Sequence, residues 1–150
     1  YGVSYLRRRH TGPIIAVAGA SGMAPISSIV ESALAAGMTQ PIHLFFGVRD
    51  ERDVYGEARL KELAAAHRNF AYTIVLSEPS GPTERRSGMV HEAILGRFRQ
   101  FDGCKAYLAG SPPMVNAATA LLFSFGMDRR DIHADPFYSA AERAAQEPGR

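Results

Sequence analysis

The chain alternates between short apolar runs and amphipathic segments, and this alternation constrains its fold more than any other feature. The five apolar runs stand at residues 14–18, 42–48, 70–76, 105–109 and 132–134. The first run contains no polar residue, as expected for a central parallel strand that helices cover on both faces. The runs therefore predict five strands.

The segments between the runs have the periodicity of helices. After the first run, apolar residues recur at i, i+3, i+4, i+7 and i+8, which places them on one helix face; they are Ile26, Ile29, Val30, Ala33 and Leu34. Similar patterns predict helices at residues 58–66, 90–101 and 114–125, and residues 77–88 form the longest predicted loop. Because such alternation produces right-handed crossovers, we predict an α/β fold, with an open, doubly wound, mostly parallel five-stranded sheet and helices on both faces.

The charge balance and the cysteine count exclude several classes of protein. The 17 basic and 15 acidic residues leave a formal charge of +2, which argues against a nucleic-acid or membrane partner. An iron–sulfur cluster needs about four thiolates, so the single cysteine, Cys104, cannot hold one. No apolar stretch approaches the roughly 20 residues that span a bilayer, and we expect a cytoplasmic protein. The histidines have no metal-ligand spacing, so no metal site is expected.

Two glycine-bearing strand ends indicate where a ligand binds. In open α/β sheets, ligands bind beyond the carboxyl ends of the strands, where the strand order reverses. Residues 19–25 form a glycine-rich turn that allows close approach of a ligand, followed by a helix start that suits a pyrophosphate. The turn matches neither G-x-G-x-x-G nor a Walker loop, so alone it is also compatible with a tight turn that binds nothing. Gly110 and the prolines after it repeat the arrangement, and together the two ends predict a crevice.

Four motifs stand at these strand ends. They are Gly-Ala-Ser-Gly-Met-Ala-Pro at 19–25, Phe-Gly-Val-Arg at 46–49, Val-Leu-Ser-Glu-Pro at 75–79 and Tyr-Leu-Ala-Gly-Ser-Pro-Pro-Met at 107–114. In this order they resemble the Rossmann-like dinucleotide-binding half of the ferredoxin–NADP reductase superfamily. The chain is most similar to reductase components of bacterial aromatic-ring oxygenases, of the naphthalene dioxygenase and phenol hydroxylase types, over residues 2–138. The resemblance implies the tail of a flavin domain and a linker at 1–10, an NAD(P)-binding domain at 11–138 and a C-terminal tail at 139–150.

The resemblance also implies a function. The domain would hold NADH so that hydride passes to FAD, and electrons would then leave through a [2Fe-2S] centre to a ferredoxin or oxygenase component. FAD and the cluster are expected in the protein's own flavin and iron–sulfur domains, outside these residues, so the chain alone is expected to be inactive. The alternatives are an NADPH-preferring relative and a non-catalytic nucleotide-binding module. Two positions depart from the family, which commonly has glycine at Ala20 and cysteine at Ala109.

The candidate binding residues follow from these motifs. The cofactor-binding residues are predicted to be Gly19, Ala20, Ser21, Gly22, Met23, Pro25, Arg49, Asp50, Ser77, Glu78, Ala109, Gly110, Ser111, Pro112, Met114 and Phe137. No catalytic residue is expected among them, because hydride transfer needs orientation more than acid–base groups. His43 lies inside a predicted strand, and we interpret it as a core or edge residue rather than a base.

The choice between NADH and NADPH depends on the charges near the adenosine ribose. A 2′-phosphate requires arginine or lysine, whereas a free 2′-hydroxyl is well served by a carboxylate. Ser77 and Glu78 stand where NADP-using relatives typically carry Ser-Arg, and Asp50 offers a second carboxylate. These residues favour NADH. The arginines that would instead favour a phosphate are Arg49, Arg85 and Arg86.

Overall fold

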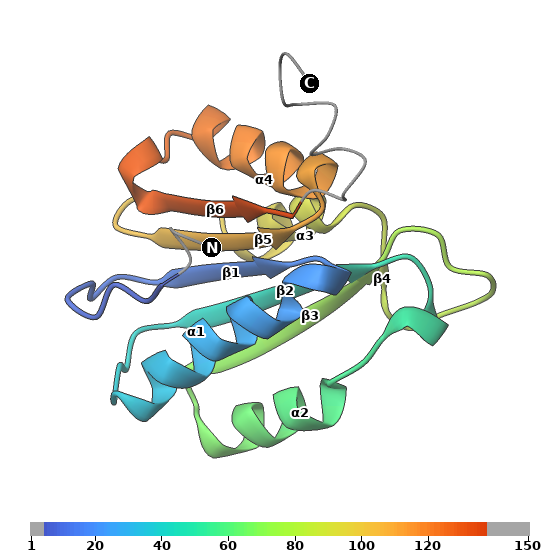
Figure 1. Cartoon of the computed structure of the whole chain (residues 1–150), viewed down its shortest axis with the longest axis horizontal. Coiled ribbons are helices and arrows are strands. Elements are labelled where there is room, and N and C mark those ends of the chain that lie inside the picture. The colour runs from blue at the N-terminus through green and yellow to red at the C-terminus, as the bar shows by residue number, and fades with distance from the viewer. Residues whose placement is uncertain (1–4, 138–150) are drawn as a thin grey trace, which may run out of the picture.

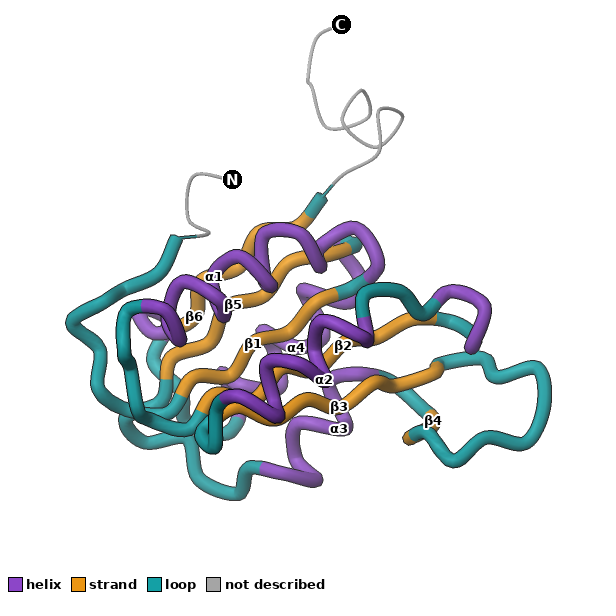
Figure 2. The backbone as a smooth tube through the Cα atoms, turned by 90° about the horizontal axis from the view of Figure 1, so that it is seen from below, coloured by secondary structure: helices purple, strands orange, loops and turns teal. Residues whose placement is uncertain are grey.

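A parallel sheet of six strands forms the centre of residues 5–137, the part of the chain that the computed structural model describes (Figure 1). The strands are β1 (Ile14–Ala18), β2 (Ile42–Val48), β3 (Phe70–Leu76), β4 (Arg86–Ser87), β5 (Lys105–Gly110) and β6 (Ile132–Pro136). Their spatial order is β4-β3-β2-β1-β5-β6 (Figure 2), and each neighbouring pair is parallel. The order therefore reverses between β1 and β5. The predicted tail at 139–150 and residues 1–4 of the predicted linker lie outside the described residues.

The predicted fold class is confirmed, but the predicted number of strands is one too low. The additional strand, β4, has two residues and lies within the predicted loop, where Arg86 pairs with Val75 and Ser87 pairs with Leu76. The N–H of Gly88 continues the contact by donating to the carbonyl of Leu76 at 2.9 Å. A two-residue strand of exposed polar side chains has no apolar periodicity, so no sequence pattern signals it.

Helices cover both faces of the sheet. They are α1 (Met23–Ala35), α2 (Glu57–Ala66), α3 (Val90–Arg97) and α4 (Pro112–Ser124), and short 3₁₀ turns lie at Ala20–Gly22, Glu51–Asp53 and Arg129–Asp131. The helices α1 and α2 pack on one face (Figure 1), and α3 and α4 pack on the other. No helix in residues 5–137 is long and apolar enough to cross a membrane.

The third predicted helix is too long by one turn. It ends at Arg97, and Phe98 has extended backbone angles of −119° and 130°. Phe98 and Phe101 are nevertheless buried in the same core as α3, with their rings stacked at a centroid distance of 6.4 Å. Burial of loop residues at helical spacing thus imitates a longer helix.

Alternate residues of β1 supply the two cores. Ile14, Ala16 and Ala18 belong to the core under α1 and α2, whereas Ile15 and Val17 belong to the core under α3 and α4. All five are at most 1% exposed. Because both faces of the strand are covered, its sequence is apolar throughout, as the first run predicted.

Candidate functional site

The ends of β1 and β5 meet at the point where the strand order reverses. The N–H of Gly19 donates to the carbonyl of Ala109 at 2.9 Å. Gly110 has a φ of 152°, and a Cβ atom added to it would lie 2.9 Å from the nitrogen of Gly19. A Cβ atom on Gly22 would lie only 1.9 Å from the Ala109 oxygen. Side chains are therefore excluded at Gly22 and Gly110, where the ends of β1 and β5 pack backbone against backbone, and the Cε atom of Met114 lies against Gly19 and Gly110.

A groove of about 560 Å³ opens over the carboxyl ends of β1, β2 and β3. This volume lies in the usual range for small-molecule sites, about 300–1,000 Å³. The predicted site residues that line it are Gly19, Ala20, Ser21, Arg49, Ser77, Ser111 and Met114. The crevice predicted from two glycine-bearing strand ends thus corresponds to a groove in the structure.

Other groove residues are missing from the sequence-based prediction. They are Gly47, Val48, Asp53, Val75, Gly88, Met89, Val90, His91 and Pro113. Gly47 carries the signal that would have found several of them, because a lone glycine inside a strand often marks a close approach. A Cβ atom on Gly47 would lie 2.8 Å from the Cβ atom of Val90. This contact brings the start of α3, with Met89 and His91, to the groove.

Several predicted residues support the groove without lining it. Gly22, Met23, Ala109 and Gly110 are buried beneath its floor, and Pro25 and Pro112 lie in the first turns of α1 and α4. The N–H of Phe137 donates to the carbonyl of Gly110 at 2.8 Å, and its ring packs against the core under α1. Phe137 therefore holds the end of β6 against the end of β5.

The helix starts differ in how well they suit an anion. The first turn of α1 contains no acidic residue, so its positive dipole end is not compensated. The first two positions of α4 are prolines, which have no N–H to donate. Ser111 precedes them and its hydroxyl does not cap the helix. The turn before α1 is further fixed by Tyr55, whose hydroxyl donates to the carbonyl of Ala20. A pyrophosphate is therefore served better by α1, with Ser21, than by α4.

The two predicted carboxylates of the adenosine side have different surroundings. Asp50 is only 6% exposed, and its Oδ1 atom accepts hydrogen bonds from the N–H groups of Glu51 and Ser80 at 2.8 and 3.1 Å. The Ser80 hydrogen bond is the largest of the causes that hold the pKa of Asp50 below its usual value. Asp50 therefore fastens the loop after β3 and does not line the groove. Glu78 is exposed, and its N–H donates to the carbonyl of Arg49 at 2.8 Å, beside the groove.

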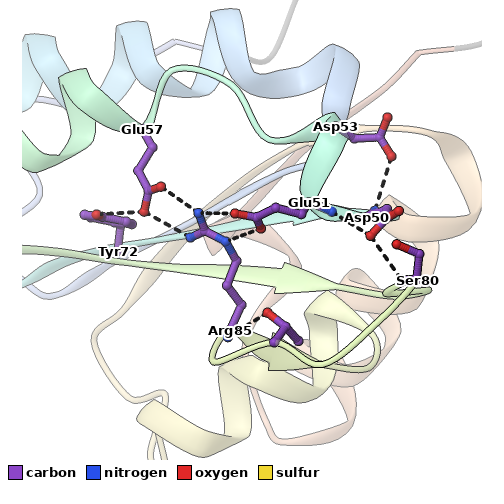
Figure 3. Close-up of polar contacts among 8 residues, drawn as sticks. Asp50, Glu51, Asp53, Glu57, Tyr72, Ser80 and Arg85 are labelled. Atoms are coloured by element: carbon purple, nitrogen blue, oxygen red, sulfur yellow. Dashed lines mark hydrogen bonds and ion pairs between the residues drawn. The ribbon is translucent and has the colours of Figure 1, made fainter.

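Arg85 also lies away from the groove. Its guanidinium is hydrogen-bonded by Glu51 and Glu57 in a second cavity of about 790 Å³, under the loop that joins β3 to β4 (Figure 3). No group of three or more histidine, cysteine, aspartate or glutamate residues within 5–137 is arranged to hold a metal ion.

The comparisons with known proteins agree with this geometry. Residues 16–120 match the family model of the oxidoreductase NAD-binding domain. The ferredoxin–NAD(P)⁺ reductase component of the naphthalene 1,2-dioxygenase/salicylate 5-hydroxylase systems of a Ralstonia species is 48% identical over 138 residues, which is 91% of this chain and 42% of that protein. The reductase component of phenol 2-monooxygenase from Pseudomonas sp. (strain CF600) is 37% identical over 149 residues, 97% of this chain and 42% of that protein.

A solved structure shares both the fold and the sequence. The cytochrome P450 reductase GcoB of Amycolatopsis superposes with a TM-score of 0.81 at 32% identity, over 87% of this chain and 39% of that chain. This chain spans about two fifths of the length of these relatives. The resemblance seen in the sequence motifs is confirmed: the chain belongs to the family of oxidoreductase NAD-binding domains of the ferredoxin–NADP reductase superfamily.

Proposed function

We propose that this chain is the NADH-binding domain of a flavin-dependent reductase that passes electrons to an oxygenase system. The observation that carries the proposal is the groove at the point where the strand order reverses, lined there by Gly19, Ser111 and Met114. The names of the relatives, which are reductase components of aromatic-ring oxygenases, support the acceptor class. FAD, held by a preceding domain to which residues 1–10 belong in part, would supply the hydride acceptor, and a [2Fe-2S] centre elsewhere in the protein would take single electrons.

The residues of this chain would bind and orient the dinucleotide. The turn from Gly19 to Gly22 and the start of α1 would hold the pyrophosphate. The nicotinamide would lie against Ser111 and Met114, which line the groove above the buried Gly110. Ala109 is buried and contributes only backbone at this point, so no thiol assists the transfer. The chain's contribution to catalysis is then positioning, with no proton moved by its own side chains.

The adenosine ribose would lie between β2 and β3. Ser77 lines the groove there, and Glu78 follows it at the rim. A carboxylate at this place accepts hydrogen bonds from ribose hydroxyls and repels a 2′-phosphate. We therefore propose a preference for NADH over NADPH.

Calorimetric titration with NADH and with NADPH at fixed salt tests this proposal. The wild-type chain is expected to bind NADH more tightly, and Glu78→Arg is expected to shift the NADH/NADPH affinity ratio by about tenfold towards NADPH, because one charge-assisted hydrogen bond to phosphate replaces a repulsion. Glu84→Arg, which makes the same charge change at an exposed position of the same loop, is the matched control and should shift the ratio far less.

The possible results separate the parts of the proposal. If neither dinucleotide binds to the chain or to a longer chain that includes the flavin domain, dinucleotide binding is refuted. If the wild type prefers NADPH, the role of Glu78 is wrong and the phosphate ligand is one of Arg49, Arg85 and Arg86. Binding without NADH oxidation in the flavin-containing chain would indicate a nucleotide-binding module instead of a reductase.

A further inference from the structure

Two carboxylates hold Arg85 in the loop between β3 and β4 (Figure 3). Its Nε and Nη2 atoms donate to Glu51 at 2.6 and 3.0 Å, and its Nη1 and Nη2 atoms donate to Glu57 at 3.0 and 2.7 Å. These two bidentate pairs engage four of the five N–H donors of the guanidinium. The hydroxyl of Tyr72 donates to Glu57 at 3.1 Å and fixes that carboxylate from its other side.

The cluster is partly buried and carries a net negative charge. The side chains of Arg85 and Glu57 are 23% and 21% exposed, so solvent and salt screen this pair less than an exposed surface pair. The hydrogen bonds from Arg85 are the main cause that lowers the pKa of Glu57 and of Glu51. Both carboxylates are therefore ionised at neutral pH, and with one guanidinium they leave one negative charge. Lys61 of the same cavity offsets part of this charge, and only one N–H donor of the guanidinium is left for a phosphate dianion.

The pairing of β3 with β4 places the backbone of Arg85 close to the end of β3, where the adenosine is proposed to bind, although its guanidinium does not line the groove. It directly precedes β4, where Arg86 pairs with Val75, and Ser77 of the groove follows Val75 by two positions. Arg85 and Ser77 are thus three positions apart along the strand direction, or about 10 Å at the rise of a β-strand. A freed arginine side chain would cover most of this distance.

The neighbouring Arg86 points to the other face of the sheet. Its Nη1 atom lies 3.0 Å from the position that a Cβ atom on Gly96 of α3 would take, whereas Arg85 faces α2. Arg85, just before β4, and Arg86, in its first position, therefore direct their guanidinium groups towards different helices. Arg85 faces the side of the loop where two carboxylates engage it.

We propose that Glu51 and Glu57 set the dinucleotide preference by sequestering Arg85. The loop thus contains a latent 2′-phosphate ligand that is neutralised and turned away from the groove. NADPH is rejected by this masking as well as by the repulsion from Glu78. This inference rests on the proposed function, because it concerns the adenosine end of the same groove.

The test removes the two charges and keeps the arginine. In Glu51→Gln/Glu57→Gln, the guanidinium is no longer held by carboxylates, and its binding to a 2′-phosphate should appear. Adenosine 2′,5′-bisphosphate and AMP are the probes, because they differ only in the 2′-phosphate; NADPH and NADH are titrated beside them. The ratio of the bisphosphate affinity to the AMP affinity should be about tenfold higher in this variant than in the wild type. This gain should decrease as the salt concentration rises.

Two further variants assign the gain to Arg85. It should disappear in Glu51→Gln/Glu57→Gln/Arg85→Gln. The control Glu62→Gln removes a glutamate from another arginine pair on α2, between Arg59 and Glu62 at 3.1 Å, and should leave the ratio at the wild-type value. Glu51→Gln/Arg85→Gln, which removes the arginine and keeps the net charge of the cluster, should change NADPH binding less than twofold, because the masked arginine does not contact the phosphate.

Each outcome has one meaning. An unchanged ratio in the folded double variant overturns the inference, as does a gain that persists without Arg85, which would belong to Arg49. If Glu51→Gln/Glu57→Gln does not fold, the charge-matched Glu51→Gln/Arg85→Gln decides, since a marked loss of NADPH binding there would show that Arg85 already binds the phosphate. If the wild-type protein binds NADH but the variants show no gain in 2′-phosphate binding, only the masking is refuted. Wild-type protein that binds no dinucleotide refutes both proposals.

Discussion

Gly22→Ala is expected to lower the free energy of unfolding by about 3 kcal/mol, the upper part of the range for overpacked sites. The new Cβ atom would lie 1.9 Å from the oxygen and 2.2 Å from the carbonyl carbon of Ala109. These are backbone atoms in the middle of the molecule, where β5 pairs with β1, and no flexible side chain can move aside. The end of β5 would have to shift, and the groove residues that follow it, Ser111 and Met114, would shift with it. Urea unfolding of the two proteins measures the difference.

Gly81→Ala is the control for this substitution. Gly81 lies in the exposed loop after β3, and a Cβ atom there meets nothing within 4 Å. Its change in stability should stay within about 0.5 kcal/mol, as for most surface substitutions. Equal stability of the two variants would show that the turn before α1 does not press on β5 as described. If Gly22→Ala folds, its NADH affinity should fall together with its stability, since the same turn is proposed to hold the pyrophosphate.

The parts of the site that sequence reasoning found are those set by the strand ends. Gly19 and Gly110 each follow an apolar run directly, and parallel strands place such ends at one edge of a sheet. That edge could be predicted because it depends only on the alternation of strands and helices. The apolar spacing of Ile26 to Leu34 likewise predicts a helix there, and the structure extends it to the thirteen residues of α1 (Met23–Ala35).

The parts that sequence reasoning missed depend on contacts between distant segments. The loop after β3 is fastened by Asp50 and by Arg85, through hydrogen bonds that join residues about 30 positions apart in the chain. Nothing in the sequence shows that the carboxylate of Asp50 accepts a hydrogen bond from the N–H group of Ser80. Similarly, Met89 and His91 reach the groove because Gly47 lets α3 approach β2. Local sequence patterns predict the helices and strands and their order along the chain. They do not predict which charged side chains of the loops form hydrogen bonds or ion pairs with one another.

Stability is expected to fall as the pH is lowered from about 6.5 towards 4, and His43 on β2 is one of two histidines that cause the loss. His43 is 7% exposed, its Nε2 atom lies 2.7 Å from the hydroxyl of Thr73, and its ring packs on Phe45 at a centroid distance of 4.4 Å. The buried position agrees with the interpretation of His43 as a core residue. Burial, aided by the positive charge of Arg97, lowers its pKa to about 4.

The sign of the pH effect follows from proton uptake. In the unfolded chain a histidine titrates near 6.5. Below that pH the unfolded state binds a proton that the folded state does not accept until about pH 4, so the folded state loses stability across this interval. The difference between 6.5 and 4 corresponds to at most about 3 kcal/mol for His43. His133 on β6 has its pKa lowered to about 4, mainly by burial, and adds to the loss in the same direction.

Urea unfolding of the wild type and of His43→Gln between pH 4 and 7 measures the contribution of His43 to the pH dependence of the free energy of unfolding. Glutamine keeps a hydrogen-bonding amide for Thr73 and cannot take up a proton, so the dependence of stability on pH should become shallower by the share of His43. His67→Gln, at the end of α2, should keep the wild-type slope. The carboxylates Asp50 and Glu57 have pKa values below their unfolded values of 3.8 and 4.5, so the stability they contribute begins to be lost only at the acid end of this interval and continues to fall below it. An undiminished slope in His43→Gln would assign the acid sensitivity to His133, and with it to the edge of the sheet instead of its core.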